Sequence, residues 1–386
     1  MSKVSSNKAI IALVSFYKDY NYGTQLQAYA LSTTILKLGE SCEYVQYRDF
    51  PKSFRPLLKL WKMFRTILIT LGLRKDNFEF SYFNSPEFRK IKHGFECFTT
   101  NYIPESTKVY YKDTLKSANN KYKIVIVGSD QTWSKFMTLN QESYLFLDFV
   151  DENIKKCAYA PSLGTTHIDD GYKIKLQQKL VGFNKLSCRE PENAKLLSDI
   201  LGKKVLHVLD PTLLINSREW LSITEDTYVV PEKNYILCYI LGEKECISAF
   251  AEELGRIKKM PVYYILTRPM YLVKDRVLKD VCPRSFIKLI SLADYVITDS
   301  FHGTIFSINL HTNFYSFAKR ADTEGFNDND RIVSFLKILG LENRFQDDAA
   351  PLLQKDIEFD IVDQKMESLR ALSISYLEEI INDKVQ

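Results

Sequence analysis

The stretch DYVITDSFHGTIFSINL, residues 294–310, combines an apolar strand, a polar elbow and an apolar helix. The first N–H groups of a helix lack partners within the helix, and the helix dipole is positive there, so an anion binds favourably at such a point. We expect Ser300 to cap the helix, Gly303 to let another group approach closely, and His302 to touch the ligand. A capping elbow with a packed histidine is the structural alternative, and both readings stay open at this point.

The same alternation of strand, loop and helix runs through the chain. Apolar runs at 9–16 and 42–47 flank an amphipathic stretch at 24–39, which predicts a strand–helix–strand start. The pattern restarts after a polar stretch at 216–234, which we interpret as a linker. We therefore predict an α/β protein with two doubly wound Rossmann-like domains that face a cleft. Further strands are expected within 123–134, 155–164, 184–190, 203–215, 235–241, 261–267, 294–298 and 312–318, and further helices at 244–259, 285–293 and 303–310.

Domain boundaries are predicted from the same pattern. An N-terminal Rossmann-like domain spans 1–215 and includes a basic, apolar insertion at 53–75. A C-terminal Rossmann-like domain spans 216–350 and carries the SFHG elbow. Residues 351–386 contain a long amphipathic helix near 361–383, which we expect to pack back on the first domain.

Composition excludes several classes of protein. The 52 basic and 48 acidic residues give a formal charge of +4, which is too small to indicate a nucleic-acid-binding protein. The seven cysteines form no CxxC pair, and their number is odd, which favours reduced thiols in a cytoplasm over disulfides or a zinc cluster. The apolar run at 9–16 is interpreted as a buried strand and not as a signal peptide, and we predict no membrane span and no metal site.

The insertion at 53–75 permits two interpretations. Trp61, Phe64 and Leu68 can share one helical face, with lysine and arginine side chains around them. Such a helix can pack on its own domain with a solvated basic side. It can also lie on a membrane that contains anionic lipid, at its cytoplasmic surface.

Polar residues follow several predicted strands, where ligands bind in open α/β sheets. Asp130 in GSDQTW can accept a sugar hydroxyl or act as a base, or it can simply cap the next helix. Arg189 in SCRE can bind phosphate or carboxylate, or it can form a structural pair with Glu190. The loop at 19–31 contains neither GxGxxG nor a P-loop, which argues against a dinucleotide or a Walker-type triphosphate.

Seven short motifs occur in an order that resembles the polysaccharide pyruvyl transferase family. They span about residues 10–341, and their order is more specific than any one of them. The motifs are NYGTQLQAYAL (21–31), IVGSDQTW (126–133), YAPSLG (159–164), SCRE (187–190), VLDPTLL (208–214), VITDSFHGTIFSI (296–308) and RIVSFLKILGL (331–341).

The resemblance implies a fold and a reaction. The implied fold is similar to the glycosyltransferase-B architecture of two Rossmann-like domains. The implied reaction moves an enolpyruvyl-derived unit from phosphoenolpyruvate onto two hydroxyls of a sugar, with a 4,6-ketal of a hexose as the common product. No cofactor is implied beyond this donor substrate. The acceptor is expected to be a precursor of a surface polysaccharide such as a capsule, and it can be linked to a polyprenyl diphosphate.

The resemblance also assigns residues to the site. The family's donor-site arginine falls on Arg189 and its elbow histidine on His302, so one cation would come from each domain. His302 would act as acid, base or phosphate contact, and Asp130 would act on the acceptor side. His167 does not fall on a family motif, although some members use a further histidine in this half. The full expected sets are Arg189, His302, Ser300, Phe301, Gly303 and Arg331 for the donor, and Asn21, Tyr22, Gln25, Asp130, Gln131 and Trp133 for the acceptor.

Two alternative functions remain at this stage. The first is a nucleotide-sugar glycosyltransferase of the same architecture. Glu245 and Glu253 have the spacing of a retaining glycosyltransferase pair, but we expect both to be solvated. The second is a glycan-binding protein without catalytic activity, for which replacing His302 would leave sugar binding unchanged.

Overall fold

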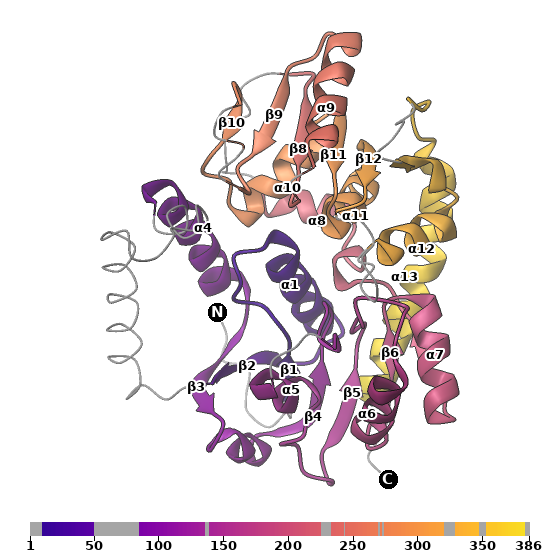
Figure 1. Ribbon diagram of the computed structural model, residues 1–386. Helices are drawn as coiled ribbons and strands as arrows, with labels where there is room; N and C mark the ends of the chain where they lie inside the picture. The colour runs from indigo at the N-terminus through magenta and orange to yellow at the C-terminus, as the bar shows by residue number, and fades with distance from the viewer. Residues whose placement is uncertain are drawn as a thin grey trace, which may run out of the picture.

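The described residues of the computed structural model form two large parallel sheets, which lie in different parts of the sequence, and one short strand pair (Figure 1). We call the part of the molecule around each sheet the first and the second domain. The insertion predicted at 53–75 lies outside the described residues. The structure describes residues 10–49, 85–135, 139–224, 233–242, 244–268, 271, 274–319, 329–346 and 353–382.

The first sheet has the parallel order β3-β2-β1-β4-β5 in the described residues. Strand β1 lies at its centre, and its residues 11–14 are buried, which is typical of a parallel sheet covered by helices on both faces. A parallel bridge between Cys157 and Lys185 leads on to the short pair β6 and β7. The strands are β1 Ile10–Val14, β2 Cys42–Arg48, β3 Glu105–Tyr111, β4 Tyr122–Val127, β5 Lys155–Ala158, β6 Ser187–Cys188 and β7 Leu206–His207.

The second sheet has the parallel order β10-β9-β8-β11-β12-β13 over its described strands. Every residue of β8, β9 and β11 is buried, and β11 leads directly into the elbow. Both sheets therefore have the doubly wound α/β arrangement that the sequence predicts. The strands are β8 Ile236–Tyr239, β9 Val262–Ile265, β10 Val277–Leu278, β11 Tyr295–Thr298, β12 Asn313–Phe317 and β13 Phe345–Gln346.

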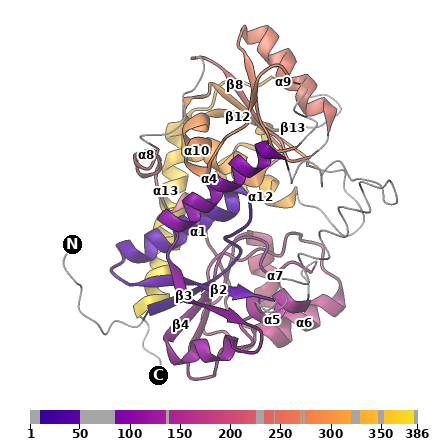
Figure 2. The same cartoon turned by 90° about the vertical axis from the view of Figure 1, so that its left-hand side faces the viewer.

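Helices connect the strands and cover the sheets (Figures 1 and 2). The helix predicted at 24–39 is α1, and the one predicted near 361–383 is α13. The described α-helices are α1 Tyr22–Lys37, α4 Pro86–Tyr102, α5 Leu139–Leu145, α6 Asp170–Leu180, α7 Pro191–Leu201, α8 Ser217–Ser222, α9 Glu245–Lys258, α10 Pro283–Leu292, α11 Phe301–Asn309, α12 Asp330–Leu339 and α13 Phe359–Asn382.

Two expectations about the chain between the domains are wrong. The strand predicted over 203–215 is only β7, because the Asp210 side chain caps a 3₁₀ turn that begins at Pro211. The polar stretch at 216–234 is not only a linker. It contains α8, whose Trp220 is fully buried.

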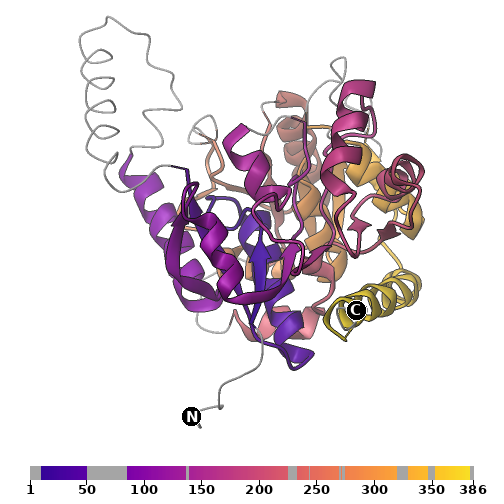
Figure 3. The ribbon, with the colours of Figure 1, turned by 90° about the horizontal axis from the view of Figure 1, so that it is seen from below.

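The last helix, α13, runs along one side of the molecule and contacts both domains (Figures 1 and 3). Tyr376 donates a hydrogen bond to the Ala158 carbonyl at 2.9 Å, and the Ser373 hydroxyl accepts one from the Leu209 N–H at 2.9 Å. At the other end of α13, Lys365 donates to the Leu339 carbonyl of α12 at 2.9 Å. The helix therefore links the first domain to the second.

Aromatic packing joins the domains on the side of α1. The Tyr22 ring stacks on Phe286 of α10, with centroids 4.4 Å apart and planes at 5°. Its hydroxyl donates to the Val281 carbonyl at 2.9 Å. Nearby, a methyl group at Gly94 of α4 would lie 2.9 Å from the Cβ of Cys282, so the backbones approach closely there. These contacts bring the carboxyl ends of the two sheets toward each other.

Candidate active site

A polar cavity of about 130 Å³ lies where the carboxyl ends of the two sheets face each other. The loops after β1 and β4 form one side, and the loops after β8, β11 and β12, together with α12, form the other. This is the location expected for a ligand in doubly wound folds. The lining residues are Asn21, Thr24, Asp130, Gln131, Leu241, Asp299, Ser300, Phe301, His302, Lys319 and Arg331.

The elbow forms as predicted. The Ser300 hydroxyl accepts a hydrogen bond from the Gly303 N–H at 3.3 Å, so Ser300 is the N-cap of α11. Asp299 is fixed by the backbone N–H groups of Leu241 and Gly242, at 2.7 and 2.6 Å. The elbow therefore presents the first turn of α11 to the cavity in a rigid form.

Gly303 allows a close approach of neighbouring groups, and these groups belong to its own domain. A methyl group there would lie 2.4 Å from the Thr298 hydroxyl and 3.0 Å from the Tyr239 ring. Both neighbours belong to the second domain. Glycine is therefore required for packing of α11 on its own sheet.

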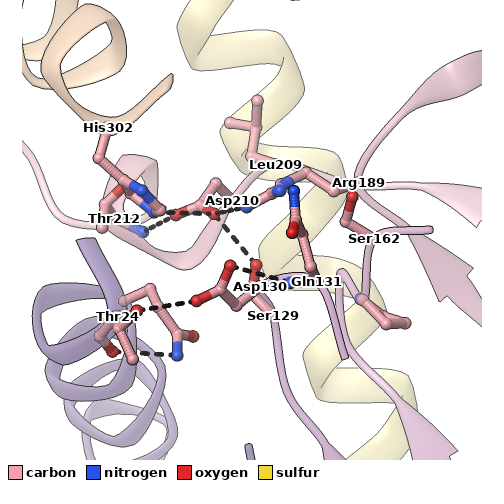
Figure 4. A network of polar contacts seen from close by, with 12 residues as sticks. Thr24, Ser129, Asp130, Gln131, Ser162, Arg189, Leu209, Asp210, Thr212 and His302 are labelled. Carbon is pink, nitrogen blue, oxygen red and sulfur yellow. Dashed lines mark hydrogen bonds and ion pairs between the residues drawn. The ribbon is translucent and has the colours of Figure 1, made fainter. Parts of the chain in front are cut away.

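His302 contacts residues of the first domain. Its Nε2 lies 3.7 Å from Asp210 Oδ2, which is an ion-pair distance and longer than a hydrogen bond (Figure 4). On the other side of the ring, a methyl group at Gly23 would lie 2.0 Å from Nδ1. The imidazole is thus held between the start of α1 and the Asp210 carboxylate.

Asp210 is the centre of a buried polar network (Figure 4). Its Oδ2 accepts hydrogen bonds from Arg189 Nη1 at 2.9 Å and from the Ser129 hydroxyl at 3.0 Å. Burial alone would raise the pKa of Asp210, but His302, Arg189 and the Thr212 N–H hold this pKa well below the usual range of an aspartate. The carboxylate therefore stays ionised beside the imidazole.

Arg189 lies behind the cavity. Its side chain is 2% exposed, and it pairs with Glu190 at 3.1 Å as well as with Asp210. Its guanidinium carbon lies 4.4 Å from the centre of the Phe301 ring, which separates it from the cavity of His302. Among the described residues, its Nη2 has no hydrogen-bond partner. The structural pair with Glu190 therefore exists, and Arg189 reaches the site through Asp210 and Phe301.

A smaller cavity, of about 10 Å³, lies on the Arg189 side of Phe301. It is lined by Arg189, Asp210, Phe301 and Arg331 among others. The Arg331 guanidinium carbon lies 5.8 Å from the Phe301 ring centre, and Arg331 also lines the cavity of His302. Arg331 thus borders both cavities.

Asp130 lies opposite the elbow. Its Oδ2 accepts a hydrogen bond from the Thr24 hydroxyl at 2.9 Å, and its Oδ1 accepts one from the Gln131 N–H at 2.8 Å. Its backbone has a φ of 79°, an uncommon conformation for a residue other than glycine. This conformation turns the carboxylate toward α1 and the cavity, and Asn21 and Gln131 line the cavity beside it.

Three of the residues expected on the acceptor side do not line the cavity within the described part of the chain. Tyr22 is used in the stack with Phe286. Gln25 is buried and donates to the Thr99 hydroxyl of α4 at 2.9 Å. Trp133 is fully buried in the core of the first domain. These assignments are wrong because successive residues of a helix or a turn direct their side chains to different sides.

Sequence reasoning missed other residues of the site. Thr24, Asp299 and Lys319 line the cavity, and Asp210 contacts His302. Asp299, Lys319 and Asp210 each follow a strand closely, which is the signal that could have identified them. His167 is exposed and does not line the cavity within the described residues, and Glu245 and Glu253 are exposed as expected.

Two further findings concern metals and membranes. Within the described residues, no group of three or more His, Cys, Asp or Glu side chains is arranged to hold a metal ion. No helix in that part of the chain is both long and apolar enough to cross a membrane.

Comparisons with known proteins agree with the motifs and with the fold. A family model described as polysaccharide pyruvyl transferase matches residues 21–319. Among solved structures, UDP-GlcNAc 2-epimerase from Methanocaldococcus jannaschii has a TM-score of 0.51 at 12% identity, over 93% of this chain and 91% of that one. A putative UDP-N-acetylglucosamine 2-epimerase from Listeria monocytogenes has a TM-score of 0.49 at 9% identity, over 95% and 97%. A search of curated proteins finds no match. The fold is thus of the glycosyltransferase-B type, as predicted.

Proposed function

Because this chain belongs to the polysaccharide pyruvyl transferase family and is therefore a transferase, we propose that it uses phosphoenolpyruvate to form a cyclic pyruvate ketal on a sugar. The acceptor sugar belongs to a precursor of a surface polysaccharide, and a hexose bridged at O4 and O6 is the expected product. One observation carries the proposal. A single polar cavity brings together His302 and Arg331 of the second domain and Asp130 of the first.

The charges of the cavity suit this donor. Phosphoenolpyruvate carries a phosphate and a carboxylate, and Lys319 and Arg331 supply positive charge beside the N-terminus of α11. Arg331 also borders the smaller cavity on the Arg189 side of Phe301. We propose that the donor anions occupy the side of the cavity formed by Lys319, Arg331 and the elbow. Arg189 then acts behind Phe301, by holding the Asp210 carboxylate.

The reaction needs one proton on carbon and two attacks by hydroxyl oxygens. Protonation of the donor's methylene carbon makes an oxocarbenium-like centre at C2, and the first sugar hydroxyl attacks it. Phosphate then leaves with the C2–O bond electrons, and the second hydroxyl closes the ketal. The hydroxyls release two protons, of which one replaces the proton used at the methylene carbon and the other leaves with phosphate. The summed reaction consumes the donor and the diol and yields ketal and inorganic phosphate.

His302 and Asp130 are proposed to handle these protons. His302 is the proposed proton donor on the donor side, and its Nε2 lies 3.7 Å from Asp210 Oδ2. Asp130 lies on the opposite side, where its carboxylate can accept a hydrogen bond from an attacking hydroxyl. No cofactor enters this scheme.

Release of phosphate from phosphoenolpyruvate, measured with a panel of hexose glycosides, tests the proposal. We expect glycoside-dependent release by the wild type, a loss of at least about 100-fold in His302→Ala, and a raised KM for phosphoenolpyruvate in Arg331→Ala. His167→Ala is the matched control, because His167 is exposed and does not line the cavity among the described residues. Calorimetric binding of UDP but not of phosphoenolpyruvate would overturn the proposal in favour of a nucleotide-sugar glycosyltransferase. Glycoside binding that is unchanged in His302→Ala, without any phosphate release, would instead indicate a glycan-binding protein.

The cellular setting is a separate proposal. A polyprenyl-diphosphate-linked acceptor would place the enzyme at the cytoplasmic face of a membrane, where the basic segment 53–75 can meet anionic lipid. Deletion of 55–75 should then weaken binding to liposomes that contain anionic lipid. Unchanged liposome binding would contradict this part.

A further inference from the structure

A second cavity, of about 410 Å³, opens at the carboxyl ends of β1 and β2 in the first domain. It borders the loop after β1. In this loop, Asp19 lines the second cavity and Asn21 lines the cavity of His302. The Cα atoms of two residues so close in sequence lie within about 7 Å of each other. The two cavities therefore flank the same short stretch of loop, and a ligand that occupied both would pass over it. The lining residues are Ser15, Phe16, Tyr17, Lys18, Asp19, Tyr47, Arg48, Asp49, Gln141, Tyr144 and Leu145.

Aromatic rings form one wall of this second cavity. Tyr47 of β2 stacks on Tyr144 of α5, with centroids 4.6 Å apart and planes at 15°. Tyr144 is fixed from behind, because its hydroxyl donates to the Val45 carbonyl at 2.7 Å. Tyr47 is only half-buried, so part of its ring faces the cavity. The apolar face of a sugar ring can pack on such a fixed aromatic side chain.

Two carboxylates also line the second cavity, those of Asp19 and Asp49. Asp49 Oδ1 is buried and, among the described residues, has no hydrogen-bond partner, although a buried carboxylate oxygen normally has one. Partial enclosure and the negative charge of Asp130 raise the pKa of Asp19. Burial and then the Asp49 carboxylate raise the pKa of Tyr47 to about 12, so its hydroxyl stays protonated and can donate. Hydroxyl groups of a ligand would satisfy these carboxylates.

The charges favour a neutral ligand in this cavity. Lys18 pairs with Glu105 and donates to Gln46 at 2.9 Å, so its positive charge is already matched. Arg48 remains beside the carboxylates of Asp19 and Asp49, so the lining carries no net positive charge that would bind a phosphate. A nucleoside diphosphate is therefore disfavoured, while an uncharged sugar with several hydroxyls fits.

We propose that this second cavity binds the sugar next to the one that is pyruvylated, so that the true acceptor is an oligosaccharide of at least two residues. Tyr47 packs on the ring of this neighbouring sugar, and Asp49 accepts hydrogen bonds from its hydroxyls. The inference rests on the proposed function, because it extends the acceptor side of the same site. It goes beyond that function because it states the length of the acceptor and names the residues that bind the neighbouring sugar.

The test compares mono-, di- and trisaccharide hexose glycosides as acceptors. We expect the wild type to show a kcat/KM for phosphate release that is at least about tenfold higher with the di- and trisaccharides. Tyr47→Ala should abolish this gain and leave the monosaccharide rate unchanged, while Asp49→Asn should reduce the gain. Tyr111→Ala is the matched control, because Tyr111 pairs with Arg48 at the same edge of the sheet but does not line the second cavity within the described residues.

A binding experiment separates failure of this inference from failure of the proposed function. The glycosides are titrated by NMR against wild type and variants, without phosphoenolpyruvate. Tighter binding of the disaccharide, lost in Tyr47→Ala, would support the subsite even if no phosphate were released. Equal kcat/KM for all acceptor lengths, equal binding in Tyr47→Ala and wild type, or no glycoside binding would each overturn it. Asp49→Asn decides the matter if Tyr47→Ala fails to fold, as judged by circular dichroism.

Discussion

Replacing Gly23 by alanine should disable the enzyme without unfolding it. The new methyl group would lie 2.0 Å from Nδ1 and 2.2 Å from Cγ of His302, whereas non-bonded carbon atoms prefer about 3.5 Å or more. The imidazole must therefore move by about 1.5 Å, out of its position between α1 and Asp210. A displacement of about 1 Å can lower a catalytic rate about 100-fold, so we expect at least that loss in kcat.

Stability should change little in the same variant. Gly23 lies in the first turn of α1, where alanine favours the helix over glycine by up to about 1 kcal/mol. This gain offsets part of the strain at His302, whose side chain can rotate away. The assay is glycoside-dependent phosphate release, with thermal unfolding of the same samples. Gly182→Ala is the control, because a methyl group at Gly182 would meet no described atom within 4 Å.

The result that would refute this reasoning is specific. If Gly23→Ala kept kcat within twofold of the wild type, the position of the His302 ring would not matter for the reaction. The double variant Gly23→Ala/His302→Ala sharpens the test. Because both changes act on one imidazole, it should be no slower than His302→Ala alone. Additive losses would show that Gly23 acts elsewhere.

Three further predictions concern the contacts that hold the site. Asp210→Asn should lower the free energy of unfolding by about 3 kcal/mol at neutral pH, because it breaks a buried ion pair while Glu190 still matches Arg189. Chemical denaturation should show this deficit shrinking as the pH falls below about 4. The lowered pKa of Asp210 stabilises the wild type fully above that pH and progressively less below it. A deficit that did not change with pH would contradict this prediction. Tyr22→Phe removes the hydrogen bond to a carbonyl of the second domain and should lower the free energy of unfolding by about 1 kcal/mol, as measured by thermal unfolding. The loss should be no larger than this, because phenylalanine keeps the ring stack. Tyr376→Ala should cost about 3–5 kcal/mol, because this fully packed ring of α13 lies on the first domain; a change in melting temperature near zero would show that α13 is dispensable.

Local patterns predicted the elements of the fold, and they placed part of the site. The order of strand, elbow and helix around Ser300 follows from apolar runs and capping chemistry, and the structure has it as expected. Asp130 was found in the same way, because it follows a buried strand. By contrast, Gln25 and Trp133 belong to the same motifs as loop residues of the site, but they do not line the cavity within the described residues. Their burial depends on which way a helix or turn directs each side chain, and that depends on the partner surface.

Asp210 shows why the rest of the site is not visible in the sequence. Its carboxylate faces a cation of its own domain, Arg189, and the imidazole of the other domain, His302. A rotation that separated the domains would leave Arg189 paired with Glu190, but His302 would lose the charge beside Nε2. The ion-pair contact of His302 with Asp210 thus exists only when the two domains are in contact. No periodicity or spacing encodes this dependence, because the two residues are 92 positions apart (302 − 210) and are joined only by the packing of the domains.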